Sequence, residues 1–593
     1  MANNKQKLEL TWIGKDNSEY DIANIEPRIL EENADLSNCE KDPNTENMII
    51  HGDNLLALKA LLPEYEGKIK CIYMDPPYNT GNAFEHYDDS VEHSTWLSLM
   101  KPRLELLKML LSDDGVLCIQ LDDVEQAYLK VLLDEVFGRS NFINQVSVKM
   151  KQTAGASGGG EDKRLKKNIE YILIYTKNYQ AFPKFNEVLE EENLFDLINE
   201  MRDQGKSWKY TRVFMSMGSR SFFSEIQDGS GLPIKIYKHS DVKISTIPEL
   251  MKAEGLTEEE TYFKYFDKIF RDTNAQSSIR TRVMDATKGA GDFFSIDYVP
   301  RSGKSKGQTV TSFYKGNNRD LIAWLKDVAV KKKNSIVKLE KLGTYWEGFP
   351  LNNLTKEGGV LFPNGKKPEA LVQRILDLIS SEGDFVLDSF LGSGTTTAVA
   401  HKTGRKYIGI EMGDHAYTHC KVRMDKVIDG SDQGGISRAV EWQGGGGYKF
   451  YELAPSFITK DEFGNAVIDV FYDDSKLIKA MCKLMSFAYQ PSKTEYWKHG
   501  VGQGKNYLYV TTQLLTSGMI QQIAGRLTEG ESLIICPKKF EPGADKIDRR
   551  ITIKKIPQSI LKACHFGKKE YLLPIKESAV EEIEIEAEED DNE

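Results

Sequence analysis

Short apolar runs alternate with helix-like stretches over residues 48–175. Buried strands are expected where an apolar run is short and continuous, as in IKCIYM, which leads directly into DPPYNTG. The stretches between these runs repeat apolar residues at the spacing of one helix face. One of them, NLLALKALLP, is expected to stop at Pro63. Because strands and helices follow each other in turn, this region predicts a parallel, doubly wound sheet.

The alternation breaks near residue 181 and resumes after residue 345. The segment between is rich in Ser, Gly, Lys, Arg and aromatic residues. After it, we expect a helix beginning at Pro368, the strand DFVLDSF, a helix opening at LGSGTTT and the strand RKYIGIE. We therefore predict an α/β fold with one Rossmann-like sheet built from residues 1–180 and 346–440. An inserted module interrupts it, and a C-terminal α+β domain follows.

Charge is distributed unevenly along the chain, whose 593 residues carry a formal net charge of −11. Residues 577–593 hold ten acids and no base, so removing them from −11 leaves −1. We interpret this segment as a disordered, solubilising acidic tail. Residues 301–338 hold ten Lys or Arg against two Asp. This basic stretch favours contact with nucleic acid, and a solvated face is the alternative interpretation.

Composition disfavours several classes of protein. No apolar run approaches the roughly 20 residues of a membrane span, and the start MANNKQKLEL lacks the apolar core of a signal peptide. The seven cysteines form no CxxC pair and none follows a proline. A zinc ribbon and a Pro-Cys nucleophile are therefore disfavoured. We expect a cytoplasmic protein without membrane contact.

The first chemical motif, Asp75-Pro76-Pro77-Tyr78, lies at the end of a predicted buried strand. Ligand sites of open α/β sheets lie at the carboxyl ends of their strands. The Asp carboxylate and a carbonyl held outward by the prolines can accept the N–H groups of an exocyclic base amine, and the Tyr ring can stack on a base. A rigid turn with a capping Asp is the structural alternative.

The second motif is a glycine-rich turn between a predicted strand and a helix. Glycines let the backbone approach a ligand, and a helix N-terminus favours a carboxylate. An acid ends the next strand 19 residues after the first glycine of the turn, near the offset of a ribose-binding acid. No Gly-Lys-Ser/Thr follows, so a P-loop ATPase is disfavoured. The motif comprises Asp388, Phe390, Gly392, Gly394, Thr395 and Glu411.

DPPYNTGN followed later by DSFLGSGTT resembles the β-class amino-methyltransferases of DNA, in which the catalytic motif precedes the cofactor motif. The segments HGDNLLALKALLPEYEGKIKCIYMDPPYNTGN, KNIEYILIYTKN, NGKKPEALVQRIL and EWQGGGGYKFYEL are similar to modification (Mod) subunits of type III restriction-modification systems. The resemblance covers residues 45–180 and 345–575. It implies a site-specific DNA methyltransferase that flips its target base, transfers a methyl group from S-adenosyl-L-methionine to adenine N6 and needs no metal.

The resemblance also implies roles for single residues. Those that would bind and activate the adenine are Asp75, Pro76, Pro77 and Tyr78. Those that would bind the cofactor are Asp53, Lys367, Pro368, Asp388, Phe390, Gly392, Gly394, Thr395 and Glu411. In this second set, Lys367 and Pro368 would lie beside the methionine part and Glu411 would hold the ribose hydroxyls. A helix N-cap is the alternative for Asp53.

Partners follow from the same resemblance. It implies double-stranded DNA as substrate, a homodimer, and a separate motor-nuclease restriction (Res) subunit. The insert carries no matched motif and is expected to recognise the target, with DNA-binding candidates at Lys304, Lys306 and Lys315. Two alternatives remain: a solitary adenine methyltransferase without a restriction partner, and a catalytically silent DNA-recognition subunit.

The predicted domain organisation combines these observations. The parts are an N-terminal extension (1–45), the catalytic half of the methyltransferase domain (46–180), the target-recognition domain (181–345), the cofactor-binding half (346–445), a C-terminal domain proposed for dimerisation (446–576) and the acidic tail (577–593).

Overall fold

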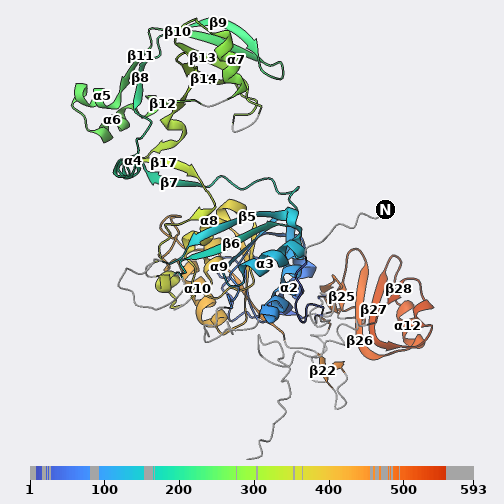
Figure 1. Ribbon diagram of the computed structural model, residues 1–593. Coiled ribbons are helices and arrows are strands. Elements are labelled where there is room, and N and C mark those ends of the chain that lie inside the picture. Colours follow the sequence, from blue (N-terminus) through green and yellow to red (C-terminus); the bar gives the residue numbers. More distant parts are fainter. Residues whose placement is uncertain are drawn as a thin grey trace, which may run out of the picture. The chain divides into compact units, whose positions relative to one another are not determined.

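The computed structural model (Figure 1) describes residues 9–16, 22, 25, 28–79, 93–151, 165, 167–274, 277–301, 305–351, 354–362, 365–454, 458–460, 466–468, 478–479, 481–482, 485–492 and 494–555. Its contacts divide the chain into two compact units, Glu187–Leu342 and the remainder on both sides of it. The inserted unit thus begins and ends within a few residues of the segment expected at 181–345. Lys304 and the acidic tail at 577–593 lie outside the described residues.

A ten-stranded mixed sheet forms the centre of the larger unit. In spatial order its strands are β1 (Leu30–Glu32), β21 (Lys449–Leu453), β2 (Met48–His51), β20 (Lys406–Glu411), β19 (Phe385–Asp388), β3 (Ile69–Met74), β4 (Leu111–Leu121), β6 (Ile169–Thr176), β5 (Phe142–Lys149) and β18 (Tyr345–Trp346). The sheet takes strands from both sides of the insert, which confirms the predicted α/β sheet of two segments.

The prediction of a parallel sheet holds for the central strands and is wrong toward both edges, one of which is formed by β1, antiparallel to β21. Neighbours from β21 through β4 pair in parallel. Strand β6 pairs antiparallel with both β4 and β5. Antiparallel neighbours do not need the crossover helix that parallel neighbours require, so the alternation of elements in the sequence did not reveal this change of direction.

Continuous apolar runs form the central strands because both faces of the sheet are covered. In β3, only Lys70 is not fully buried. On one face, Ile72 and Met74 share a core with α1 (Asn54–Tyr65), α2 (His93–Leu110) and α3 (Gln126–Leu133). Across the sheet lie α8 (Glu369–Ile379), α9 (Thr395–Lys402) and α10 (Val422–Asp429) (Figure 1).

Helix α1 continues through Pro63 to Tyr65, so the predicted stop at Pro63 is wrong. A proline in the last turn removes a single backbone hydrogen bond. Tyr65 is 8% exposed and packs into the core, which favours completing the turn.

The inserted unit contains an eight-stranded antiparallel sheet. In spatial order its strands are β11 (Lys243–Thr246), β8 (Arg212–Ser216), β12 (Ile269–Thr273), β15 (Asp320–Trp324), β14 (Val310–Lys315), β13 (Phe293–Tyr298), β10 (Pro233–Ser240) and β9 (Ser219–Gln227). One core of this sheet joins Ile236 and Phe294 to Val283 of α7 (Ser278–Ala286). A second core joins Phe214, Phe270, Phe293 and Ile322, and no helix residue contributes to it among the described residues.

The remaining elements of the insert form a smaller assembly. Helices α4 (Leu194–Asp203), α5 (Ile247–Glu254) and α6 (Glu258–Tyr265) share one core. A three-stranded sheet accompanies them, formed by β16 (Ala329–Lys331), β17 (Ile336–Lys341) and β7 (Leu189–Asn193).

The C-terminal region of the larger unit has its own sheet and core. The strands are β24 (Ala488–Tyr489), β25 (Gly500–Val501), β26 (Asn506–Leu515), β27 (Ser532–Phe540) and β28 (Ile551–Ile553). Trp497 is fully buried and packs with residues of these strands and of α12 (Ser517–Ala524). Across the described part of the chain, no helix combines the length and the apolar character needed to cross a membrane.

Candidate active site

The two chemical motifs meet at one edge of the central sheet. Strands β3 and β19 are parallel neighbours, with Val386 opposite Cys71. Strand β3 leads into Asp75, and β19 ends at Asp388, where the glycine-rich turn begins. Because the carboxyl ends of parallel neighbours lie side by side, motifs far apart in the sequence form one site.

The carboxylate of Asp75 is held by an ammonium from the other segment of the sheet. Lys367 Nζ donates to Asp75 Oδ2 at 2.6 Å, and the two side chains are 7% and 20% exposed. The second oxygen, Asp75 Oδ1, is buried and has no hydrogen-bond partner within the described residues. Burial raises the pKa of Asp75, and the charge on Lys367 opposes that rise. The site therefore offers one free, buried acceptor.

Glu170, a residue that the sequence analysis missed, organises the aromatic part of the site. Its Oε2 accepts from the Tyr78 hydroxyl at 2.9 Å and from Gln120 Nε2 at 2.6 Å. Gln120 Oε1 in turn accepts from the Tyr73 hydroxyl at 2.7 Å. Burial, together with the charges of Asp75 and Glu170, raises the pKa of Tyr78 well above its usual value, so its hydroxyl remains a donor. The signal was a single acid inside the apolar strand NIEYILIYT.

The turn that presents Tyr78 is braced from behind. Trp96 Nε1 donates to the Pro77 carbonyl at 2.8 Å. Asn79, which adopts a φ of 59°, donates through Nδ2 to Glu125 at 2.6 Å. Asn tolerates this left-handed conformation better than most residues. The motif is thus a rigid turn as well as a cluster of functional groups.

The glycine-rich turn is held from inside by Asp388. Its Oδ1 accepts from the backbone N–H of Phe390 at 3.0 Å, and its Oδ2 accepts from the Thr396 hydroxyl at 2.6 Å. Burial raises the pKa of Asp388 to about 7, against these two hydrogen bonds. Gly392 and Gly394 have φ values of 56° and 77°, a region in which side chains are strained. The Asp388 side chain thus supports the turn that would hold the cofactor.

Glu411 supports the same turn from the neighbouring strand. Its two oxygens accept from the backbone N–H groups of Gly392 at 2.8 Å and Gly413 at 2.9 Å. The residue is 1% exposed. Glu411 therefore fixes the backbone of the turn, and its contact with the ribose stays a prediction.

A buried ion network lies directly behind the turn. Lys402 donates to both oxygens of Glu369 at 2.9 Å and to Asp432 at 2.7 Å. Arg423 donates to Glu369 at 2.7 Å and to the Thr395 hydroxyl at 2.8 Å. The side chains of Lys402, Glu369 and Arg423 are 0% exposed. This network could not be predicted from the sequence, because a single charged residue on an amphipathic helix usually faces solvent.

The other cofactor candidates lie around these groups. Asp53 is the N-cap of α1, accepting from the backbone N–H of Leu55, and it pairs with Arg103 at 3.3 Å. Asp53 is therefore a helix N-cap, the alternative that the sequence had left open. Pro368 is the N-cap residue of α8, and Phe390 is 6% exposed in the core.

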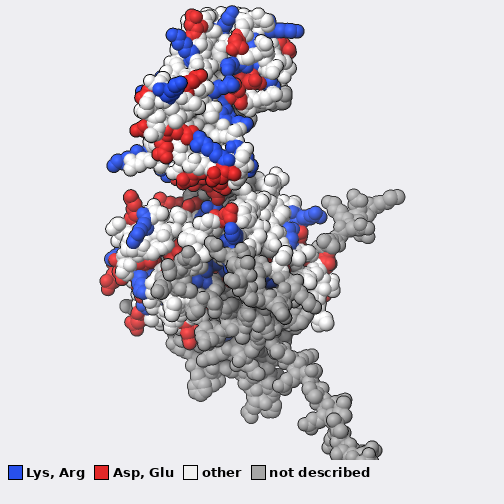
Figure 2. All heavy atoms as spheres, turned by 60° about the vertical axis from the view of Figure 1, so that its left-hand side comes forward, with Lys and Arg blue, Asp and Glu red and all other residues white. Residues whose placement is uncertain are grey.

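The DNA-binding candidates have different surroundings in the inserted unit. Lys306 is exposed. Lys315 Nζ lies 4.0 Å from Asp272, which also pairs with Arg212. Figure 2 shows the Lys and Arg side chains of the visible surface interspersed with acids. On this face, charge alone therefore does not mark one DNA-binding surface.

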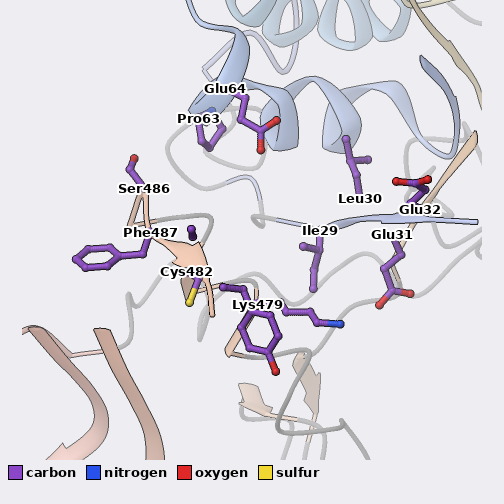
Figure 3. Close-up of a pocket in the computed structure, with 12 residues that line it drawn as sticks. Ile29, Leu30, Glu31, Glu32, Pro63, Glu64, Lys479, Cys482, Ser486 and Phe487 are labelled. Atoms are coloured by element: carbon purple, nitrogen blue, oxygen red, sulfur yellow. The ribbon is translucent and has the colours of Figure 1, made fainter. Parts of the chain in front are cut away.

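A separate hollow of about 850 Å³ has no connection with the motifs. It lies beside β1 and the end of α1 (Figure 3). Its lining includes the acidic residues Glu31, Glu32 and Glu64 and the basic residue Lys479. No residue of either chemical motif lines it, so it is not the candidate active site.

Comparison with known proteins identifies relatives of this chain. The sequence model of a family described as DNA methylase matches residues 69–421. A probable type III restriction-modification enzyme HindVI Mod subunit of Haemophilus influenzae is 45% identical over 76% of this chain and 59% of its own length. The EcoP15I Mod subunit of Escherichia coli is 27% identical over 79% of this chain and 75% of its own. The chain thus spans about three-fifths of the HindVI subunit.

Among solved structures, similarity is weaker. The cytosine-N4-specific PvuII DNA methyltransferase is 12% identical, with a TM-score of 0.31, over 64% of this chain and 86% of that chain.

Proposed function

This chain belongs to the DNA methylase family, and on that premise we propose that it transfers a methyl group from S-adenosyl-L-methionine to adenine N6 in duplex DNA. The observation that carries the proposal is the free, buried oxygen of Asp75 beside the Tyr78 ring, next to the glycine-rich turn. The HindVI and EcoP15I relatives are named as type III Mod subunits, which supports the same role for this chain.

The turn fits a cofactor that carries a carboxylate and ribose hydroxyls. A Cβ on Gly392 would have only Phe362 near it, at 4.0 Å, so space lies over this glycine. The turn opens the eight-residue helix α9 at Gly394, and a helix N-terminus favours a carboxylate. Gly392, Gly394 and Glu411 would hold the cofactor, which supplies an electrophilic methyl group.

Asp75 would raise the nucleophilicity of the base amine. The N6 lone pair is delocalised into the ring, and an acceptor aimed at an N–H of N6 favours the pyramidal nitrogen that reacts. The bound cofactor would supply the methyl group to N6, and the Asp75 carboxylate, hydrogen-bonded to N6, would accept the proton that N6 loses. Tyr78 would stack on the flipped adenine. Holding the reactants in line accounts for much of the acceleration.

Methyl incorporation into DNA tests the activity. Wild-type protein, Asp75→Asn and a matched control, Asp377→Asn, are incubated with labelled cofactor and bacterial DNA, and modified positions are sequenced. Asp377 lies on α8 and pairs with Arg405 rather than with a residue of either motif, and its side chain is 36% exposed. We expect N6-methyladenine from the wild type and the control, and at least about a hundredfold less from Asp75→Asn. Methylation of cytosine, or none by the wild type, refutes the proposal.

The same proposal includes partners. We infer a homodimer that methylates by itself and cuts DNA only with a separate Res subunit. The support is the type III naming of the relatives and the separate sheet of the C-terminal region. Light scattering of the full chain tests the dimer, since a monomer with full activity contradicts it. ATP-dependent cleavage by the pure chain contradicts the division of labour.

Target recognition is assigned to the inserted unit, and to one face of its large sheet. Three partly exposed rings, Tyr237, Phe313 and Trp324, define this aromatic face. They are supported from below by the buried rings of Phe214, Phe270 and Phe293. Arg220 lies 3.7 Å over the Tyr237 ring, and Arg212 and Lys315 share Asp272. Phosphates can replace Asp272 as the partner of these two cations, and the partly exposed rings can stack on bases.

Salt dependence of DNA binding tests this face. Arg212→Ala combined with Lys315→Ala removes two cations, so the slope of log affinity against log salt falls by about 2. Lys264→Ala is the control, because this exposed lysine pairs with Glu254 on the helical side of the unit. An unchanged slope in the double variant, or an equal fall in the control, excludes this face. Lys304 and Lys306 remain candidates to be tested in the same way.

A further inference from the structure

We propose that Lys367 is an internal stand-in for the target base: its ammonium occupies the adenine site in the DNA-free enzyme, and the flipped base displaces it toward Glu170. This inference rests on the proposed function of the site. It assigns Lys367 to the base pocket as a positioning residue, whereas the sequence had suggested contact with the cofactor.

The ammonium makes the contacts that an adenine would make. It donates an N–H to Asp75 Oδ2 at 2.6 Å, on the same carboxylate whose other oxygen would accept from the N6 amine. It lies 4.9 Å from the centre of the Tyr78 ring, over the face on which the base would stack. The Lys367 side chain is 7% exposed, so it fills the pocket rather than guarding its mouth. A base and this ammonium therefore compete for the same carboxylate and ring.

Glu170 provides a second position for the displaced ammonium. Its carboxylate lies 3.7 Å from Lys367 Nζ, so a short movement converts this contact into a full ion pair. An ammonium released in a buried pocket without a partner is strongly disfavoured, because its desolvation is not compensated. With Glu170 beside it, Lys367 exchanges one carboxylate for another and the adenine receives Asp75. Glu170 also holds the Tyr78 hydroxyl, so the receiving carboxylate is already oriented by the residue that stacks on the base.

The backbone of Lys367 connects this exchange to the cofactor turn. The Lys367 carbonyl accepts from the Thr395 hydroxyl at 3.4 Å, and Thr395 is the first residue of α9. Next in the chain, Pro368 is the N-cap residue of α8. The ammonium faces the base pocket while the carbonyl faces the cofactor turn. The side chain of Lys367 therefore belongs to the base pocket and its backbone to the cofactor turn, so replacing the side chain leaves the contact with the turn in place.

Charge balance in the pocket supports the same assignment. Burial disfavours the ammonium, yet the charges of Asp75 and Glu170 outweigh it and raise the pKa of Lys367. Without Lys367, Asp75 and Glu170 would face each other as two buried carboxylates, and the pKa of Asp75 would rise further. The acid limb of the rate profile would then move to higher pH.

Base flipping measured by fluorescence tests the proposal. The probe is a duplex containing the methylated site found by sequencing, with a fluorescent adenine analogue at the target position. Lys367→Met is compared with Lys367→Arg, which keeps the charge, at alkaline pH, where Asp75 is ionised. We expect Lys367→Met to flip the base without cofactor about tenfold more favourably, or about 1.4 kcal/mol. Lys367→Arg should remain near the wild type.

Two further measurements keep the test decisive. Titration with S-adenosylhomocysteine should give similar affinity in Lys367→Met and the wild type, which also shows that the variant folds. In an otherwise wild-type chain, Glu170→Gln removes the receiving charge and should weaken flipping. The proposal is overturned if Lys367→Met flips the base less well, or if it loses affinity for S-adenosylhomocysteine with flipping unchanged. Failure of the wild type to methylate adenine would instead refute the proposed function.

Discussion

Replacing Glu369 by Gln should destabilise the larger unit far more than an equivalent change on its surface. Glu369 is 0% exposed, and its carboxylate accepts from Lys402, Arg423 and the backbone N–H of Ile436. The amide removes the negative charge while the two cations remain buried. Removal of one partner from a buried ion network costs about 3–5 kcal/mol.

The matched control is Glu105→Gln. Glu105 pairs with Lys101 one helical turn away, and their side chains are 29% and 24% exposed. A surface pair of this kind contributes about 0.3–0.5 kcal/mol. The same chemical change therefore differs in expected cost by about tenfold, solely because of burial.

Urea unfolding of the full chain measures the difference. The transition of the larger unit, followed by far-UV circular dichroism, should shift to lower urea in Glu369→Gln and barely move in Glu105→Gln. Affinity for S-adenosylhomocysteine should fall only in Glu369→Gln, because Arg423 also donates to Thr395 of the turn. Equal urea midpoints in the two variants would refute the reasoning that the network supports the turn.

The network also has a pH signature. Burial would raise the pKa of Glu369, but the charges of Arg423 and Lys402 outweigh it and the pKa is lowered. A carboxyl whose folded pKa is lowered stabilises the fold above its unfolded pKa, and this contribution is lost as the pH falls through the folded pKa. The difference in free energy of unfolding between the wild type and Glu369→Gln should therefore become smaller as the pH falls below 4.5, the usual pKa of a Glu carboxyl. A difference that grows there would contradict the assigned sign.

Three further predictions concern the two motifs. Tyr78→Phe should keep the stacking ring but lose the hydrogen bond to Glu170. The loss of about 1 kcal/mol should lower the methylation rate several-fold, whereas Tyr78→Ala should lower it much more. Equal activity of the two variants would show that the ring is not used. Gly394→Ala places a Cβ at a φ of 77° and 3.3 Å from the backbone of Cys420, so calorimetric melting should show a free energy of unfolding lower by about 1–2 kcal/mol. Gly205→Ala, with a φ of 68° and open space around its Cβ, is the control for backbone strain alone and should lose less stability. The pKa of Asp388 is about 7 in the folded chain and 3.8 in the unfolded chain, so between these pH values only the folded chain keeps this proton. The free energy of unfolding of the wild type, relative to that of Asp388→Asn, should therefore fall as pH rises through this window. An increase in this difference would refute the assignment.

The sequence by itself determined the local elements and the position of the chemistry. The continuous apolar run IKCIYM predicted a buried strand, and Asp75 lies where that strand ends. The glycines at 392 and 394 predicted a tight turn before a helix, and both adopt a positive φ. The loss of alternation near residue 181 predicted an insert within one sheet. These features depend on neighbours in the chain, whose spacing can be read directly from the sequence.

Only the tertiary structure decided which distant groups meet. Lys367 and Asp75 are 292 residues apart and form an ion pair. Glu170 is separated by 50 residues from Gln120, which binds it, and the antiparallel pairing of β6 brings the two together. Strand direction, buried charge pairs and the orientation of the Lys367 ammonium depend on contacts across the sheet. Such contacts leave no periodic signal along the chain, because each is made once between residues that are not neighbours in the sequence.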